Sequence, residues 1–177
     1  MKRICVFCGA SQGGRAAYLH AAEAIGTELA HRQIGLVYGG GALGLMGAMA
    51  NAALTAGGEV IGVVSRQFVT QEKVHDRLAR VYVATTAPER LGLMAELSDA
   101  FIVLPGGIGT IEEFWEVLTL VQRAETDKPC GLLNTDGFYD DLLSFLDHAA
   151  NERFLPPCRS ILLVERDSDQ LLSRFCA

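Results

Sequence analysis

Residues 100–118 read AFIVLPGGIGTIEEFWEVL and combine an apolar run, a glycine-rich turn and a helical pattern. The run at 100–105 is continuously apolar, which is typical of a strand that is covered on both faces. Beyond the glycines, apolar residues recur with helical spacing, and the pattern predicts a helix over 110–124. A strand that passes through a tight turn into a helix is the repeating unit of parallel α/β sheets.

The same unit recurs from end to end of the chain. Apolar runs predict strands at 4–9, 34–39, 59–64, 81–85, 100–105, 130–134 and 161–165. Helical patterns lie at 16–32, 43–56, 88–98, 110–124, 138–151 and 167–175. This alternation predicts a single-domain, Rossmann-like, doubly wound parallel α/β sheet over residues 1–177, with helices on both faces. The polar segment 65–80 is predicted to be a loop with a short helix.

Composition narrows the class of protein. A chain of 177 residues, half of them apolar, suits one domain with a large core. The net charge of −6 and the absence of a Lys/Arg run argue against a nucleic acid polymer as partner. The first apolar run is too short for a signal peptide, and no apolar span reaches about 18 residues. We therefore expect a cytoplasmic protein without a membrane partner.

The five cysteines are scattered along the chain. Cys5 and Cys8 form a C-x-x-C pair, but both belong to a predicted buried strand, and we interpret them as core thiols rather than as a redox or metal site. The histidines are also scattered and predict neither a metal cluster nor a Cys–His nucleophile. We therefore expect no metal site.

The first of two glycine loops is YGGGALGLMG at 38–47. Gly39, Gly41 and Gly44 form a G-x-G-x-x-G pattern between a predicted strand and a predicted helix. Ligands bind beyond the carboxyl ends of such strands, where a glycine backbone can approach a phosphate closely. The candidate substrate-binding residues here are Gly39, Gly40 and Gly41. A tight turn that binds nothing is the structural alternative.

The second glycine loop belongs to the opening stretch. Its candidate substrate-binding residues are Gly106, Gly107, Ile108, Gly109 and Thr110. Thr110 is expected as the N-cap of the helix, with Glu113 in the first turn completing a capping box. Capping does not explain the preceding glycines. A carboxylate beside backbone donors for a phosphate would suit chemistry on a sugar phosphate.

Several blocks of the sequence together resemble one known family. PGGIGTIEE matches the PGGxGTxxE signature of the Lonely Guy family, the cytokinin-activating nucleotide phosphoribohydrolases that were long mislabelled as lysine decarboxylases. Further blocks look like family blocks in family order: CVFCGAS, GLVYGGG, GGEVIGV, SDAFIVLPGG and DKPCGLLNTDGFYDDLL. The resemblance covers nearly the whole chain.

The resemblance implies hydrolysis of the N-glycosidic bond of N6-substituted adenosine 5′-monophosphates, giving free base and ribose 5-phosphate. It implies a homodimer that uses no metal or redox cofactor. Arg90 and Glu113 correspond to the proposed catalytic pair, and Glu72, the Gly106–Glu113 loop and Thr119 to substrate contacts. The chain departs from the family where it has Pro88 and Leu91, since histidine and lysine are usual there.

Two other classes of protein stay open. One is a carrier that binds a nucleotide or a molybdenum cofactor without catalysis. The other is an NADP-binding oxidoreductase, because the strand after the first glycine loop ends in VVSR. That ending has no acidic partner for a ribose, although Arg66 would suit a 2′-phosphate. The glycine loops contain no lysine, which argues against a P-loop ATPase.

Overall fold

A computed structural model describes residues 1–66, 69, 74–156 and 161–175. The described residues form one seven-stranded sheet in the order β4-β3-β2-β1-β5-β6-β7, and every neighbouring pair is parallel. The strands are β1 (Arg3–Phe7), β2 (Gly35–Tyr38), β3 (Val60–Ser65), β4 (Arg80–Ala84), β5 (Ala100–Val103), β6 (Cys130–Leu133) and β7 (Leu162–Glu165). The predicted strands are confirmed to within two residues at each end.

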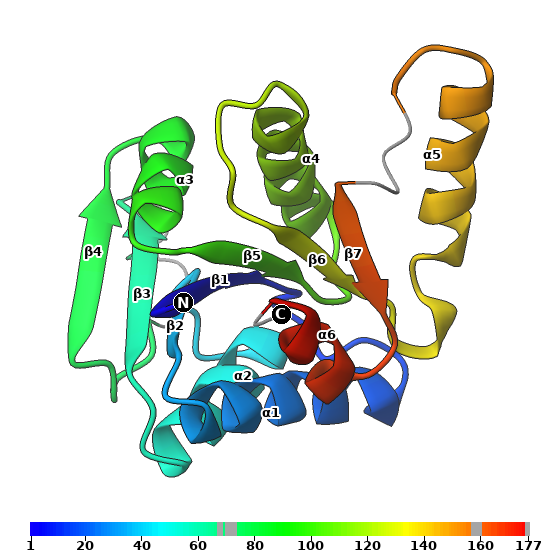
Figure 1. The fold of residues 1–177 in the computed structure, drawn as a ribbon. Helices are drawn as coiled ribbons and strands as arrows, with labels where there is room; N and C mark the ends of the chain where they lie inside the picture. Colours follow the sequence, from blue (N-terminus) through cyan, green and yellow to red (C-terminus); the bar gives the residue numbers. More distant parts are fainter. Residues whose placement is uncertain (67–68, 70–73, 157–160, 176–177) are drawn as a thin grey trace.

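Helices cover both faces of this sheet, which confirms the doubly wound fold. They are α1 (Ala16–His31), α2 (Gly44–Thr55), α3 (Ala87–Glu96), α4 (Ile108–Gln122), α5 (Asp140–Asn151) and α6 (Ser168–Phe175), with a short 3-10 turn η1 (Thr135–Gly137). Figure 1 shows α1, α2 and α6 on one face and α3, α4 and α5 on the other. The described positions within 65–80 form no helix. In the described part of the chain, no helix combines the length and the apolar character needed to cross a membrane.

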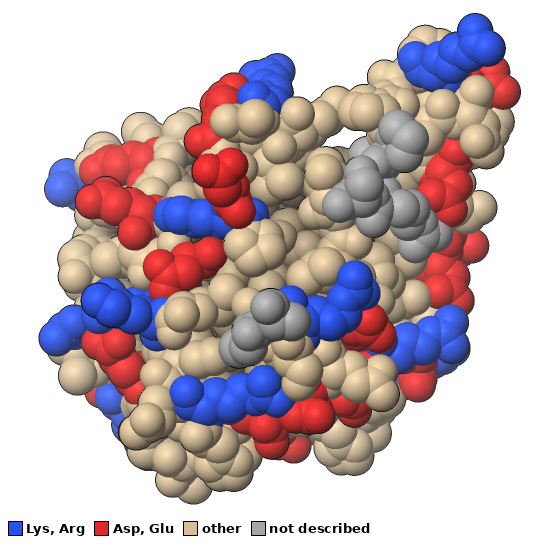
Figure 2. Space-filling view, viewed as in Figure 1, with Lys and Arg blue, Asp and Glu red and all other residues tan. Residues whose placement is uncertain are grey.

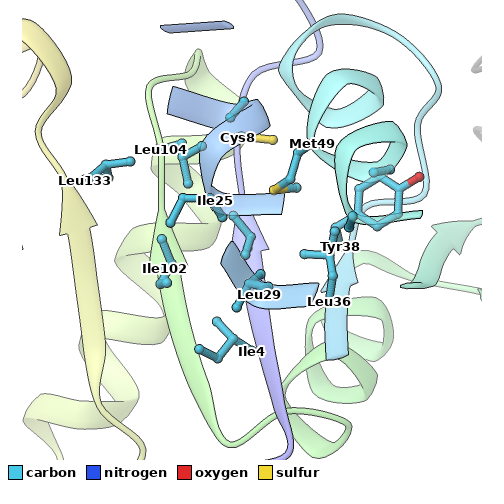
Figure 3. Close-up of a cluster of buried hydrophobic side chains, with 14 of the residues drawn as sticks. Ile4, Cys8, Ile25, Leu29, Leu36, Tyr38, Met49, Ile102, Leu104 and Leu133 are labelled. Atoms are coloured by element: carbon cyan, nitrogen blue, oxygen red, sulfur yellow. The ribbon is translucent and has the colours of Figure 1, made fainter. Parts of the chain in front are cut away.

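Two apolar layers hold the helices against the sheet. The layer under α1 and α2 includes Ile25, Met49 and Ile102 (Figure 3). A Cβ on Gly26 would lie 2.2 Å from the carbonyl oxygen of Met49, so the glycine allows α1 and α2 to pack closely. The layer under α3, α4 and α5 includes Phe101 and Phe114.

Strand β4 differs from the prediction of a strand covered on both faces. Val81, Tyr82 and Val83 are exposed, because β4 is the edge strand and pairs only with β3 among the described residues. A continuously apolar run does not reveal whether its strand lies at the edge or in the middle of a sheet.

The cysteines that the structure describes are buried thiols, as predicted. Cys5, Cys8 and Cys130 are free and buried, and burial raises the pKa of Cys130 to about 12. Cys158 and Cys176 lie outside the described residues.

The fold brings two loops together where the strand order reverses. The chain crosses from one side of β1 to the other at β5, and ligands of open α/β sheets bind at such a switch point. The N–H of Gly9, after β1, donates to the carbonyl oxygen of Pro105, after β5, at 3.0 Å. We therefore expect a ligand-binding site at the carboxyl edge of the sheet.

Candidate active site

A cavity of about 760 Å³ opens at this carboxyl edge. Its volume lies within the range of small-molecule sites. The end of β3 and the segments that follow β1, β2, β4 and β5 contribute to its wall, which includes Cys8–Ser11, Gly39, Ser65, Thr85–Ala87, Arg90, Gly107, Gly109, Thr110 and Glu113. The cavity therefore collects residues that are far apart in the sequence.

Arg90 and Glu113, the predicted catalytic pair, meet in this cavity. Arg90 Nη1 donates to Glu113 Oε1 at 2.6 Å, and the two side chains are only 22% and 20% exposed. Arg90 Nε donates to the carbonyl oxygen of Val63 at 2.8 Å. The guanidinium thus links strand β3 to helix α4 and fixes the position of the carboxylate.

Burial and charge act on Glu113 in opposite directions. Burial raises the pKa of the Glu113 carboxyl above its ordinary value, and the positive charge and hydrogen bond of Arg90 offset part of this rise. Glu112 and Glu116, which also line the cavity, raise the same pKa further. A carboxylate with a raised pKa is a better proton acceptor than an exposed one.

The start of helix α3, which carries Arg90 as its fourth residue, is capped by side chains. Thr86 Oγ1 accepts from the N–H of Glu89 at 3.2 Å, and Glu89 Oε2 accepts from the N–H of Thr85 at 2.7 Å. This is a capping arrangement that the T-x-x-E spacing at 86–89 would have predicted. It explains both side chains without any ligand and gives Arg90 a rigid base.

Gly39 lies against the guanidinium of Arg90, where there is no room for a side chain. A Cβ at this position would lie 2.6 Å from Arg90 Nη2 and 3.1 Å from Met46 Sδ. The first glycine of the G-x-G-x-x-G pattern therefore makes room for the guanidinium.

The other glycines of that loop serve the fold. Gly44 has a φ of +61°, and its Cβ would lie 2.2 Å from the carbonyl oxygen of Ala10, so α2 starts directly against the loop after β1. Gly40 has a φ of +79°, and Gly41 forms an isolated bridge with Val74. Neither Gly40 nor Gly41 is among the described residues that line the cavity.

The capping box predicted for α4 was wrong. The helix begins at Ile108, with Gly107 as its N-cap, and no described side chain caps it. Thr110 is therefore the third helical residue and is buried against Gly106, where a Cβ would lie 2.1 Å from Thr110 Oγ1. Glu113 lies in the second turn and accepts from Arg90 instead. The extended backbone of Gly107 allows the helix to begin two residues earlier than predicted.

Gly107 and Gly109 are not required by the protein's own packing. A Cβ at either position would meet no described atom within 4 Å, and neither residue has a positive φ. Both line the cavity, beside the N–H groups of the first turn of α4, which no described side chain caps. Ile108, between them, points its side chain to solvent. Glycine at 107 and 109 leaves the backbone open to a ligand.

Of the two remaining candidates, the structure describes only Thr119, which does not line this cavity. Thr119 Oγ1 donates to the carbonyl oxygen of Trp115 at 2.7 Å. Thr119 lines a second, mostly apolar hollow of about 480 Å³ between α3 and α4. Leu91 and Glu116 line both hollows, so the two are adjacent. Glu72 lies outside the described residues.

Charges on the surface are mixed. Figure 2 shows Lys and Arg interspersed with Asp and Glu over the face in view, without a basic stripe. This distribution is consistent with the expectation that no nucleic acid polymer binds there.

The sequence is similar to known proteins over most of its length. The model of a family described as "Possible lysine decarboxylase" matches residues 46–175. The chain is 46% identical to a cytokinin riboside 5′-monophosphate phosphoribohydrolase of Arabidopsis thaliana, over 94% of this chain and 78% of that protein. It is 45% identical to a probable enzyme of the same name from Oryza sativa subsp. japonica, over 98% of this chain and 71% of that protein.

A solved structure shares the fold. The molybdenum cofactor binding protein of Rippkaea orientalis superposes with a TM-score of 0.74 at 22% identity, over 100% of this chain and 99% of that chain. At this identity the likeness concerns the fold alone.

Proposed function

This chain belongs to the Lonely Guy family, the cytokinin riboside 5′-monophosphate phosphoribohydrolases, and from that premise we propose its reaction and its site. The reaction is hydrolysis of the N-glycosidic bond of an adenosine 5′-monophosphate, N6-substituted or plain, to free base and ribose 5-phosphate. The observation that carries the proposal is the Arg90–Glu113 ion pair inside a cavity bordered by the start of α4.

The start of α4 is the proposed binding site of the 5′-phosphate. Its first N–H groups have no capping side chain among the described residues, and the helix dipole favours an anion there. Gly107 and Gly109 leave these donors uncovered. We assign phosphate binding to the backbone of Gly106–Thr110, with Gly39 lining the neighbouring wall of the cavity.

Glu113 is the proposed catalytic carboxylate. As the C1′–N9 bond breaks, its electron pair leaves with the purine and positive charge develops on the ribose ring. The Glu113 carboxylate stabilises that charge and takes a proton from the water whose oxygen bonds to C1′. The purine takes up a proton, which balances the hydrolysis. The raised pKa of Glu113 suits this role.

Arg90 is the proposed partner of that carboxylate. It holds Glu113 at 2.6 Å and is itself held by the carbonyl oxygen of Val63, so the carboxylate is positioned before substrate binds. The guanidinium lines the cavity and is available to ribose or phosphate oxygens. Substrate contacts at Glu72 and Thr119 rest on the family resemblance.

We also propose a homodimer in the cytoplasm. The hollow lined by Trp115, Thr119 and Leu120 is mostly apolar and adjoins the catalytic cavity. Burial of this hollow against a second copy would place the active site near the subunit interface, as the resemblance implies. The molar mass in solution, measured by light scattering, tests this part of the proposal.

Other activities have less support. A pyridoxal-phosphate decarboxylase holds its cofactor on a lysine, and the described residues lining the cavity include none. A carrier or an NADP-dependent oxidoreductase has no need of a partly buried Arg–Glu pair in its cavity.

The experiment is to incubate the purified protein with AMP and with N6-isopentenyl-AMP and to measure ribose 5-phosphate and free base. Hydrolysis of either nucleotide supports the proposal. A protein that binds these nucleotides without cleaving them is a carrier.

A further inference from the structure

Ser65 has a buried hydroxyl that the fold does not use. It is the last residue of β3, is only 6% exposed and lines the catalytic cavity. Its Oγ makes no hydrogen bond with any residue that the structure describes. Buried hydroxyls in native proteins nearly always have a partner, so an unpaired one in the wall of a cavity indicates a group that bonds to a ligand.

The position of Ser65 in the fold indicates which part of a nucleotide it meets. Strand β2, the glycine loop, α2 and β3 form a βαβ unit. In nucleotide-binding units of this kind, the residue at the end of the second strand binds a ribose hydroxyl, usually through a carboxylate. Ser65 occupies that place here.

Ser65 also lies beside the proposed reaction centre. It follows Val63 on the same face of β3, about 6.7 Å further along the strand. The carbonyl oxygen of Val63 accepts from Arg90, which in turn holds Glu113. Ser65 therefore lines the same cavity as Glu113, two residues beyond the point where β3 holds the Arg90–Glu113 pair.

The chemistry of the cavity favours a neutral group here. Glu112, Glu113 and Glu116 already line it, and the proposed substrate carries a phosphate. A further carboxylate at residue 65 would add repulsion toward that anion, whereas a serine hydroxyl both donates to and accepts from a sugar hydroxyl.

We propose that Ser65 Oγ hydrogen-bonds a ribose hydroxyl of the nucleotide and so positions the sugar against Glu113; this inference rests on the proposed function. Ser65 is a substrate-positioning residue and takes no part in proton transfer. Its contribution should depend on the presence of one particular hydroxyl of the substrate.

The test pairs an enzyme variant with substrate analogues. Ser65→Ala and wild type are compared on AMP, 2′-deoxy-AMP and 3′-deoxy-AMP. We expect Ser65→Ala to lower kcat/KM for AMP about threefold to tenfold, the effect of one neutral hydrogen bond. For the deoxynucleotide that lacks the partner hydroxyl, the two enzymes should have equal kcat/KM. The analogue that shows this equality identifies the hydroxyl.

Ser98→Ala is the matched control. Ser98 is 1% exposed, and its hydroxyl likewise has no partner among the described residues, but it precedes β5 and is not among the described residues of the cavity wall. Its loss should leave kcat/KM unchanged on all three nucleotides. Thermal unfolding of both variants compares their folding with that of wild type.

Two results would overturn the assignment of Ser65. One is an equal loss of kcat/KM on all three nucleotides, and the other is no loss on any of them. If wild type cleaves neither these three nucleotides nor N6-isopentenyl-AMP, the proposed reaction fails separately. The same comparison is then made with dissociation constants from calorimetry, and equal weakening or no weakening by Ser65→Ala again overturns the ribose contact.

Discussion

Arg90 and Glu113 lie 23 positions apart in the sequence and form an ion pair of 2.6 Å between Nη1 and Oε1. They come from different helices, α3 and α4, whose starts are built in different ways. Thr86 caps helix α3 with its side chain, whereas the N-cap of α4 is Gly107, which has no side chain to accept a hydrogen bond. The cap of the first helix fixes the segment that carries Arg90, whereas no described side chain caps the first N–H groups of the second.

Gly39→Ala should disable the site without unfolding the protein. The added Cβ would lie 2.6 Å from Arg90 Nη2, so the guanidinium has to move and Glu113 loses its partner. We expect kcat/KM to fall at least about tenfold. Gly14→Ala is the control, since a Cβ there meets no described atom within 4 Å. Full activity in Gly39→Ala would show that the Arg90 position is unimportant.

Gly109→Ala should separate stability from substrate binding. The backbone accepts a Cβ without a clash, and alanine is a better helix former, so the free energy of unfolding should stay equal or rise by up to about 1 kcal/mol. The methyl group would project where the phosphate is proposed to bind, and KM should rise about tenfold. An unchanged KM would place the phosphate elsewhere. Substrate saturation curves and denaturant titrations give the two quantities.

The pH dependence of activity should follow Glu113. The carboxylate must be ionised to act, and burial raises its pKa, so kcat/KM should fall on acidification at a pH above the ordinary glutamate value. Because Arg90 lowers this pKa, the acid limb of the residual activity of Arg90→Gln should lie at a higher pH than in wild type. An acid limb that moves to lower pH in this variant would contradict the assigned role of Arg90.

The free energy of unfolding should also depend on the ionisation of Glu113. A raised pKa in the folded state means that ionisation of Glu113 opposes folding. The stability of wild type relative to Glu113→Gln is therefore greatest below the unfolded-state pKa and declines as the pH rises through the folded-state pKa. Denaturant unfolding of both proteins across this range measures the difference. A difference that grows with pH would mean that Arg90 outweighs burial.

Tyr139→Phe tests a hydrogen bond that stabilises the chain just before the second glycine loop. The buried Tyr139 hydroxyl donates to the carbonyl oxygen of Leu104 at 2.6 Å, just before Pro105. Its removal leaves that buried carbonyl without this donor and should lower the free energy of unfolding by about 1–2 kcal/mol. Tyr82→Phe, on the exposed edge strand, should cost nothing measurable. An equal cost for both variants would contradict the assigned contact.

Much of the fold was predictable because its continuously apolar strands alternate with helical patterns along the chain. The start of α4 was not, since Thr110 satisfies the local rule for an N-cap while the backbone of Gly107 begins the helix first. The exposure of β4 depends on its place in the sheet, which local sequence does not encode.

The site was predictable in part. Glu113 was a candidate from its place after the second glycine loop. Arg90 came from the family resemblance, because neither spacing nor composition brings residues 23 positions apart into contact. Ser65 escaped notice, since a serine that ends a strand has no pattern of its own. Its significance comes from an unpaired hydroxyl in a cavity wall, which only the packed structure reveals.

The most direct measurement is the release of ribose 5-phosphate from AMP and N6-isopentenyl-AMP by wild type, Glu113→Gln and Glu125→Gln. Glu125 follows the end of α4 and is exposed, which makes it a matched control for loss of a glutamate charge. Wild type and Glu125→Gln should turn over equally, whereas kcat of Glu113→Gln should fall about 10²- to 10⁴-fold with its circular dichroism unchanged. Turnover by Glu113→Gln at the wild-type rate, or no product from wild type with either nucleotide, would contradict the account.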